Sequence, residues 1–398
     1  MAYSKIIHKY KIELTSSNEN ISLDLSQNNS VKEINMLYNY FKSSYPIIVL
    51  NLALTEPELN SIRDNNLTFF LRIYRLIDSA EETENGISDT ITDKIIFESY
   101  LKPFDNPVIT KYTKKDEDSE TSEENEINQK FDYQVSTIMS EPLLYNDEII
   151  NEVFENATVT ESVVSVLSKI YNEDFFMQES TNNKKYNNII IPPMNLVPAI
   201  KYIHDYYSIY DYNLNIFFDN HKLFIFDILK SNQGENENSL TIEVKPKNDA
   251  SENIEYGAPL IDEKDNVLIY MSNEPIYGST KDVGENILGG SVVYNSYDDN
   301  YNLVTRTYNE NESGKVRYYW NTSRNYMQEL ANNKILTRTA SINLLNCDPS
   351  LFSPSTFIKI NSTLNYMYGE YTLLMKNIKF YFFQSSFVSS TTLSLAKI

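Results

Sequence analysis

The chain has 398 residues, of which 41% are hydrophobic, and a formal net charge of -21. This length is enough for about two or three packed domains, while the strong negative charge argues against binding to nucleic acid or to an anionic membrane. The hydrophobic residues include 31 Tyr and 19 Phe but one Trp, and there are only 9 Gly. This composition favours β-structure and counts against Gly-rich phosphate-binding loops.

The single cysteine, Cys347, cannot form an intramolecular disulfide, and the three histidines do not cluster with it at metal-site spacing. This pattern is typical of a protein made in a reducing compartment. The first residues, MAYSKIIHKYKIELTS, lack the long apolar core of a signal peptide, and no apolar run approaches the roughly 20 residues that span a bilayer. We therefore expect a soluble protein with no membrane partner.

Residues 1–130 predict a first β-barrel domain. Four segments rich in β-branched and aromatic residues, each ended by Asn, Asp or Pro, are the expected strands: YSKIIHKYKIEL, YPIIVLNLAL, LTFFLRIYRLI and KIIFESYL. A helix is also predicted, because Ser30 can cap a helix that has Glu33 three residues later. Apolar residues then follow at helical spacing: Ile34, Leu37, Tyr38 and Phe41.

This domain ends in an acidic loop, residues 114–130, with the sequence KKDEDSETSEENEINQK. The segment has almost nothing to bury, so we interpret it as a loop or linker. Its carboxylates could also bind a cation, but the D-x-D-x-D-G spacing of a calcium loop is absent.

Residues 131–235 predict a compact α/β insert domain, because the hydrophobic period becomes helical. Thr158 and Glu161 can form a capping box for the helix ESVVSVLSKIY. A short buried strand at 189–191 is expected to stop at the following Pro-Pro pair, and Asn195 to cap a second helix. The segments LNIFF and KLFIFDI then flank Asp-Asn-His, which predicts a β-hairpin. The expected core of the insert includes Ile200, Ile203, Phe217 and Phe224.

Residues 236–398 predict a second β-barrel domain with an insertion. Turn residues separate eight segments with strand character: LTIEVKP, NVLIYM, GGSVVYNSY, YNLVTRTY, KVRYYW, FIKIN, YTLLMKNIKFYFF and TTLSLAKI. One helix, RNYMQELANNKIL, is expected among them. The predicted fold class is therefore mainly β with α+β insertions.

No constellation of residues in the sequence predicts catalysis, a cofactor or a metal. His8, His204 and His221 have no partner His at helical spacing or adjacent acid that would suggest a zinc site or a triad, and nothing beside Cys347 would activate its thiol. The motifs G-x-S-x-G, G-x-G-x-x-G and the P-loop are missing. A pair of carboxylates could still hydrolyse a glycosidic bond, but among 55 acidic residues a pair can always be found. We predict no catalytic, cofactor-binding or metal-binding residues, and no enzymatic activity.

A Tyr-rich run lies in and after the second helix of the insert: Tyr202, Tyr206, Tyr207, Tyr210 and Tyr212. Such a run could stack on sugars or line a contact with another subunit. At helical spacing, a role in the core or in a subunit contact is the commoner one.

Two stretches of the chain share an order of elements with a known family. One extends from about Val159 to Leu229 and contains a helix, a polar gap, an apolar strand running into Pro-Pro, a helix, YYSIY and an aromatic hairpin. The other is GEYTLLMKNIKFYFFQSSFVSSTTLSLAKI, from Gly369 to Ile398, where a Gly-x-Tyr strand precedes an aromatic strand and an alternating one. This order resembles the baseplate hub proteins of contractile-tailed bacteriophages, which are related to the hub part of contractile injection system spikes.

The resemblance implies a structural virion protein with two tube-like β-barrels and a small α/β insert. It implies a homotrimer, a ring with pseudo-six-fold symmetry around the DNA channel, that joins the tail tube to the central spike. The implied partners are the tail tube protein, the central spike protein and the baseplate wedge proteins, while genome DNA passes the channel without specific binding. The implied location is the tail baseplate of the virion, after synthesis in the host cytoplasm.

A carbohydrate-directed tail protein, either receptor-binding or a glycosidase, is the alternative from another functional class. Proteins of that kind are usually Gly-rich β-solenoids or have Trp-lined sugar sites, whereas this chain has 9 Gly and one Trp, Trp320. The acidic charge also suits a DNA conduit, since it repels phosphate. We therefore favour the hub.

Overall fold

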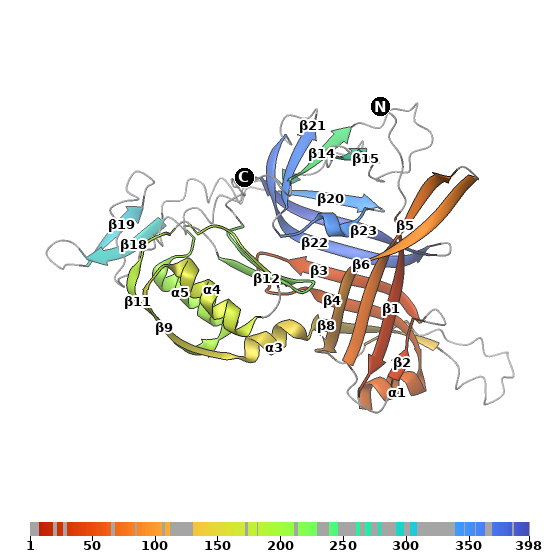
Figure 1. Ribbon diagram of the computed structural model, residues 1–398, viewed down its shortest axis with the longest axis horizontal. Helices are drawn as coiled ribbons and strands as arrows, with labels where there is room; N and C mark the ends of the chain where they lie inside the picture. Colours follow the sequence, from red (N-terminus) through yellow and green to blue (C-terminus); the bar gives the residue numbers. More distant parts are fainter. Residues whose placement is uncertain are drawn as a thin grey trace.

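β-Strands predominate in the structure, a computed structural model of the chain, which confirms the predicted fold class. Figure 1 shows a β-barrel with an α/β unit beside it. Every structural statement below refers to the residues that the structure describes: 8–18, 22–26, 30–64, 68–83, 86–105, 108–111, 130–171, 174–180, 182–210, 214–228, 239–245, 260–262, 267–271, 278–279, 292–297, 303–308, 339–345, 347–354, 356–362, 368–383 and 386–397. The predicted helix at 324–336, the predicted strand at 315–320 and nearly all of the acidic segment 114–130 lie outside these residues.

Eight strands form a closed β-barrel (Figure 1). They are β1 (Lys9–Ser17), β3 (Val31–Asn39), β4 (Ile47–Thr55), β5 (Thr68–Thr83), β6 (Gly86–Pro103), β8 (Lys130–Met139), β22 (Gly369–Phe383) and β23 (Ser386–Lys397). Their order around the barrel is β22-β3-β4-β8-β6-β5-β1-β23, and β23 pairs with β22 to complete the ring. All neighbouring pairs are antiparallel.

The C-terminal hairpin of β22 and β23 closes this barrel, which corrects the expectation of a complete barrel at each end of the chain. β22 pairs with β3 over Met375–Tyr381, and Phe387 of β23 pairs with Tyr10 of β1. Without the hairpin, β1 and β3 would be unpaired edges. Strand patterns in the sequence do not report such distant pairing. The domain boundaries at 130 and 235 remain a prediction.

The same hairpin also carries a second sheet. The start of β22 pairs with β21 (Phe357–Ser362), and the end of β23 pairs with β20 (Thr339–Leu345). Beyond β21 lie β14 (Ser239–Lys245), β16 (Val267–Met271) and β15 (Leu260–Asp262), and beyond β20 lies β17 (Gly278–Ser279). Over the described residues this second sheet is open, so a closed barrel and an open sheet share one hairpin.

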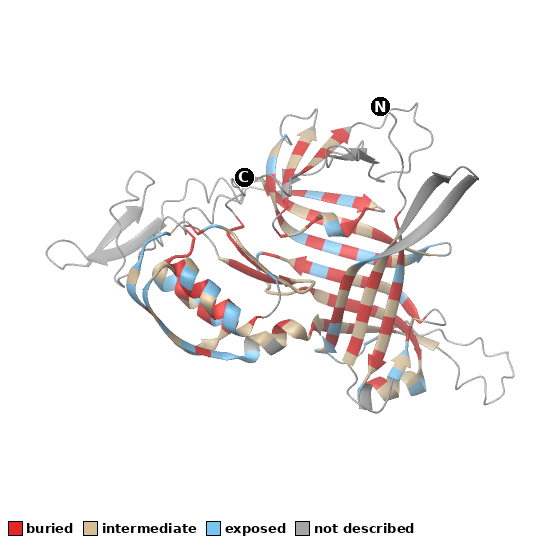
Figure 2. Cartoon of the chain, in the orientation of Figure 1, coloured by how far each residue is buried: buried red, intermediate tan, exposed pale blue. Residues whose placement is uncertain are grey.

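Side chains fill the barrel, so its interior is a core and not a channel. Inward-facing residues alternate along each strand, as the red bands in Figure 2 show. Several of them have no exposed surface: Leu14, Leu50, Phe69, Leu71 and Leu373. An eight-strand barrel is just wide enough for side chains of this size.

The helix predicted after Ser30 is wrong, because this segment is the strand β3. Ile34, Met36 and Tyr38 are buried at a spacing of two, and the strand pairs with β4 and β22. A register shift beside Val31 inserts one residue before the alternation begins. The pattern imitated helical spacing because Leu37 and Phe41 are apolar although they are exposed.

The α/β unit contains three helices and a two-stranded ribbon beside them (Figure 1). The helices are α3 (Glu141–Asp147), α4 (Val159–Ile170) and α5 (Leu196–Tyr207), and the ribbon pairs β9 (Ile149–Ala157) with β11 (Tyr186–Asn195). The predicted capping box is confirmed: the Thr158 hydroxyl accepts from the Glu161 N–H, and the Glu161 carboxylate accepts from the Thr158 N–H.

The predicted end of the 189–191 strand at the Pro-Pro pair is wrong, because β11 continues to Asn195. A register shift between Ile191 and Met194 lets the strand pass through the two prolines. Prolines are tolerated at bulges and on strands with a free edge, and over the described residues β11 pairs only with β9. Asn195 precedes α5 as predicted, but its side chain makes no capping hydrogen bond.

The predicted hairpin is confirmed as β12 (Asn215–Asp219) and β13 (Lys222–Phe226), and β13 also pairs with β10 (Phe175–Met177). Its turn residues Asn220 and His221 have φ angles of 44° and 65°. Positive φ at both positions is what a two-residue hairpin turn requires.

The two faces of this hairpin pack in different cores. One face, which includes Phe218, packs with the helices in the core that contains Ile200 and Ile203, as predicted for those two residues. The other face places Phe217 and Phe224 in the barrel core, so their predicted place in the insert core is wrong. The hairpin lies between two layers, and adjacent side chains of a strand point to opposite sides.

The remaining elements are short: β2 (Ser22–Asp24), α1 (Glu56–Asp64), β7 (Val108–Lys111), β18 (Val292–Tyr297), β19 (Leu303–Tyr308) and a 3-10 turn at Pro349–Leu351. None of the helices in the described residues combines the length and apolarity needed to cross a membrane.

Candidate functional site

The three histidines and Cys347, which were considered as possible site residues, lie in separate places and make local contacts. Burial, with a smaller effect of Arg75, lowers the pKa of His8 to about 4. Burial raises the pKa of the Cys347 thiol, which therefore stays protonated. Nδ1 of His204 accepts from the backbone N–H of Ile209 at 3.3 Å. These contacts are structural ones.

His221 has an acidic neighbour that its sequence position does not reveal. Its Nδ1 lies 2.7 Å from Oε2 of Glu141, at the start of α3. This pair links the turn of the β12–β13 hairpin to the helix that follows β8. Within the described residues, no three His, Cys, Asp or Glu side chains are arranged to hold a metal ion.

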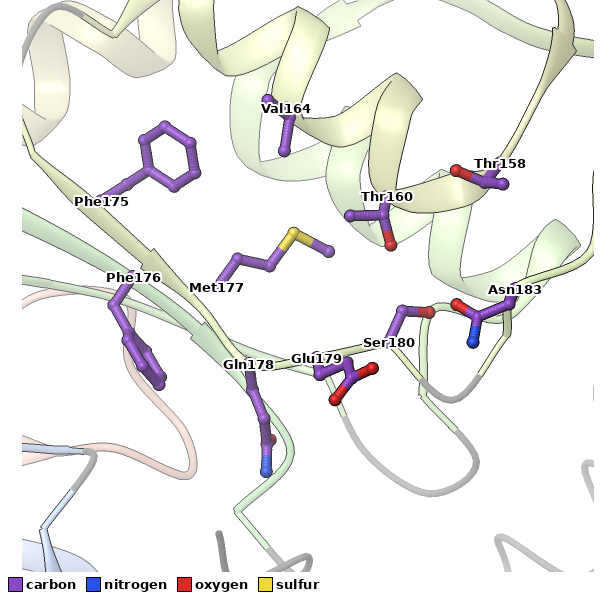
Figure 3. A pocket seen from close by; sticks show the side chains of 10 residues that line it. All are labelled: Thr158, Thr160, Val164, Phe175, Phe176, Met177, Gln178, Glu179, Ser180 and Asn183. Carbon is purple, nitrogen blue, oxygen red and sulfur yellow. The ribbon is translucent and has the colours of Figure 1, made fainter. Parts of the chain in front are cut away.

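A pocket of about 550 Å³ lies between the start of α4 and the strand β10 (Figure 3). Val164, Phe175 and Met177 form its apolar wall, and Glu179 is the single carboxylate among its lining residues. Glycoside hydrolysis normally needs two facing carboxylates. This pocket therefore lacks the pair that the glycosidase alternative requires.

A groove of about 610 Å³ lies at the seam where β1 separates from β23. Over the described residues, β1 shares a single residue pair with β23 and pairs with β2 from Thr15 onward. The stretch of β1 between these contacts, with Lys11 and Glu13, forms one wall of the groove. Phe382 and Phe387, whose ring centroids lie 5.4 Å apart, belong to the other wall.

Charged side chains form a row across the outer face of the barrel beside this groove. The strand registers place Glu13, Arg72 and Glu98 opposite one another on β1, β5 and β6. Arg72 makes an ion pair with Glu98 and lies 3.8 Å from Glu13. A hydrogen bond from Lys11, followed by smaller effects that include Tyr74, lowers the pKa of Glu13. Glu13 is thus held as a carboxylate and is unsuited to be the general acid of a glycosidase.

Aromatic side chains flank this charged row. Phe70 and Tyr100 are cross-strand neighbours with ring centroids 4.9 Å apart, and the Arg72 guanidinium lies 5.0 Å from the centroid of Phe70. On the other side, Tyr74 lies opposite Ile95. Tyr100 is 60% exposed and Ile95 47%. Exposed aromatic residues beside an arginine are the composition of protein–protein contact centres.

A buried lysine ties the barrel to the insert. Nζ of Lys376 donates to the carbonyl of Phe352 at 2.6 Å and lies 3.9 Å from Oδ2 of Asp219 and 4.3 Å from the Tyr38 ring centroid. Burial lowers the pKa of Lys376 and raises that of Asp219, and each charge partly offsets the effect on the other. The cluster joins β22 to the hairpin β12–β13 and so fixes the insert on the barrel.

The Tyr-rich run divides between surface and core. Tyr202 and Tyr206 stack with centroids 4.3 Å apart, and Tyr206 is 45% exposed. Tyr210 is buried, and its hydroxyl lies within hydrogen-bond distance of two backbone carbonyls. Tyr212 lies outside the described residues. A continuous Tyr platform for sugars is therefore not formed by the described members of the run.

A family model described as Bacteriophage PBS1 gene 109 protein matches residues 1–397. The chain belongs to this family. No curated protein matches the chain. Together with the similarity to the Neisseria meningitidis tail protein, the match confirms the resemblance to phage tail proteins.

Among solved structures, the chain is similar to the tail protein from Neisseria meningitidis MC58, with a TM-score of 0.51 and 9% identity over 98% of this chain and 97% of that chain. It is also similar to the 43 kDa tail protein of prophage MuSo2 from Shewanella oneidensis (TM-score 0.47, 9% identity, 97% and 96% covered). A third is the E. coli c3393 protein, a component of the type VI secretion system (TM-score 0.38, 9% identity, 93% and 74% covered). At this identity the first similarity shows a shared fold, that of a tail protein.

The charged and aromatic face of the barrel was missed from the sequence because it joins β1 to the β5–β6 hairpin, which is distant from β1 in the chain. A signal for it exists within single strands. Lys9 and Lys11 are two residues apart in one strand. Since residues at even spacing share a face of a strand, such lysines in a strongly acidic chain indicate an exposed cationic face.

Proposed function

We propose that the chain is a structural protein of a phage tail and serves as the baseplate hub, joining the tail tube to the central spike. The observation that carries the proposal is the closed barrel whose C-terminal hairpin continues into a second sheet. The same fold extends over 98% of the chain in its match to a tail protein. Membership of the PBS1 gene 109 family supports a place in a phage particle.

The proposed assembly is a homotrimer around a DNA channel. Because side chains fill the barrel, the channel has to lie between copies of the chain. Each copy contributes two β units, the closed barrel and the open sheet, so three copies place six units around the axis. The charge of -21 repels phosphate, which lets DNA pass without binding.

In this proposal, the tail tube protein, the central spike protein and the baseplate wedge proteins are the neighbours of the ring. The chain is made in the host cytoplasm and incorporated into the baseplate of a contractile tail. We propose no catalytic role, since the pocket at α4 has a single carboxylate, and Glu13, one of the two carboxylates that line the groove, is held ionised.

Cryo-electron microscopy of purified tails tests this function. We expect a ring of three copies at the end of the tail tube, in contact with the spike. Absence of the chain from tails, or its location in a fibre or in the capsid, would overturn the proposal.

A sugar-release assay tests the missing enzymatic role. We expect purified protein to release no fragments from bacterial polysaccharide or peptidoglycan at neutral pH. Reproducible release that Glu13→Gln or Glu179→Gln abolishes would instead support the glycosidase alternative.

A further inference from the structure

The outer face of β1, β5 and β6 carries positive charge in a chain whose net charge is -21. Its exposed or partly exposed charged residues are Lys9, Lys11, Glu13, Arg72, Glu98 and Lys102. Arg75 and Lys94, which pair across β5 and β6, belong to the opposite face, where Arg75 makes an ion pair with the buried Asp348. We name these six residues, together with Phe70, Tyr74 and Tyr100, the basic face.

We propose that the basic face docks an acidic surface on a second copy of this chain. The inference rests on the proposed function, because a cyclic trimer uses head-to-tail contacts between two different surfaces of each copy. With 55 acidic and 34 basic residues, acidic surface is abundant and a cationic face is scarce. Because of this charge complementarity, the basic face determines where the neighbouring copy binds.

The centre of the basic face has the composition of a binding hot spot. The tilted rings of Tyr100 and Phe70 contact each other beside Arg72, whose guanidinium is already held by Glu98. Preorganised aromatic and arginine side chains lose little entropy on binding. The groove at the β1–β23 seam begins at the same strand, with Lys11 and Glu13 in its wall. It offers a hollow of about 610 Å³ for side chains of the partner.

Nucleic acid is the other polyanion that such a face could attract, and the geometry disfavours it. Glu13 and Glu98 lie on either side of Arg72 in the middle of the face. A phosphate backbone crossing the face would meet both carboxylates, whereas a protein surface can place its own donors against them. The charge of the whole chain also repels a uniformly charged polymer at long range.

Carbodiimide cross-linking of the full-length protein tests the contact, because this reagent joins lysine amines to carboxylates without a spacer. An equal mixture of unlabelled and ¹⁵N-labelled protein distinguishes links between copies from links within one copy. We expect mixed-isotope peptides that join Lys9 or Lys102 to acidic residues. Links from these lysines that are exclusively within one copy overturn the proposal.

Charge reversal provides the matched comparison. The double variant Lys9→Glu and Lys102→Glu changes the basic face, and Lys184→Glu with Lys185→Glu makes the same change in charge at exposed lysines of the insert. In sedimentation experiments we expect the first variant to weaken self-association at least tenfold and the second to leave it within about twofold. Circular dichroism checks that both variants are folded.

The outcomes separate this inference from the proposed function. A wild-type trimer that is weakened equally by both variants, or by neither, overturns the docking face and leaves the hub standing. If the wild-type protein is a monomer at the highest concentrations in sedimentation, the docking of the basic face on a second copy is overturned. The place of the chain in the tail is then decided separately by electron microscopy of purified tails. Binding of wild-type protein to labelled DNA, lost in the first variant alone, assigns the face to nucleic acid.

Discussion

Lys376 is the residue whose loss should separate the insert from the barrel most directly. Replacing it with Met removes the donor to Phe352 and leaves Asp219 without its cation in a nearly buried site. We expect the free energy of unfolding to fall by about 3 kcal/mol, the size of loss seen when one partner of a buried pair is removed. Urea denaturation followed by circular dichroism measures this loss.

Lys379, three residues along the same strand, provides the control. It pairs with Glu33 at 2.5 Å, but its side chain is 46% exposed, so Lys379→Met should cost about 1 kcal/mol or less. Equal losses in the two variants would show that burial of Lys376 has no special role.

His8 should make stability depend on pH below neutrality. Burial lowers its folded-state pKa from 6.5 to about 4, so the unfolded chain takes up the proton first as the pH falls. Stability supplied by this residue is complete above pH 6.5 and is lost between pH 6.5 and 4, by up to about 3 kcal/mol. Urea titrations from pH 7 to 4.5 measure this slope. His8→Gln should flatten it, and a variant with the slope of the wild type would contradict the assignment.

At the scale of elements, α5 is held by the face that contains Ile203. This side chain is fully buried in the core of the insert, so Ile203→Asp places a charge without a partner there. We expect a loss of about 3 to 5 kcal/mol in the free energy of unfolding. Tyr206→Asp, on the exposed side of the same helix, is the control and should cost about 1 kcal/mol or less. Unchanged stability of Ile203→Asp in urea would mean that the face is misassigned.

The turn of the β12–β13 hairpin binds the edge of β6. The amide of Asn220 accepts from the N–H of Glu98 at 3.1 Å and donates to the carbonyl of Ile96 at 3.4 Å, where β6 has left β8. Asn220→Gly keeps the positive φ but loses both hydrogen bonds, at a cost of about 1 kcal/mol. Asn220→Ala adds backbone strain of about 1 kcal/mol.

Hydrogen exchange at the Glu98 amide measures the loss of its hydrogen bond to Asn220. Urea denaturation measures the difference in the free energy of unfolding between Asn220→Gly and Asn220→Ala. Protection of that amide as strong in Asn220→Gly as in the wild type would show that the side chain does not hold the edge.

Local signals were readable from the sequence, and signals that depend on distant partners were not. The capping box of α4 is set by Thr158 and Glu161 alone, and the hairpin turn by Asn220. By contrast, β3 was predicted as a helix because Leu37 and Phe41 are apolar but exposed, and the pairing with β4 and β22 that makes the segment a strand is not visible locally. The faces of the hairpin could not be assigned because both are apolar. The basic face depends on the pairing of β1 with β5, which are distant in the chain.

For the whole molecule, the hairpin of β22 and β23 determines whether the barrel closes. A chain that ends at Phe383 lacks β23 and leaves edges on β1, β20 and β22 without their partner. We expect such a chain to aggregate or to lose cooperative unfolding, since unpaired edges bind other strands. Size-exclusion chromatography and thermal denaturation test this. A chain that ends at Lys397 is the control and should behave as the wild type. A soluble, cooperatively folding chain that ends at Phe383 would contradict the role of the hairpin.

The position of this hairpin in the chain also sets the timing of folding during translation. Six of the eight barrel strands leave the ribosome before β22 and β23 exist. At roughly 5 to 20 residues per second, they wait on the order of ten seconds or more for the strands that close the barrel. Nascent chains therefore need protection by chaperones over this interval. Prematurely terminated products lack the closing strands, so they are left for proteolysis rather than built into a particle.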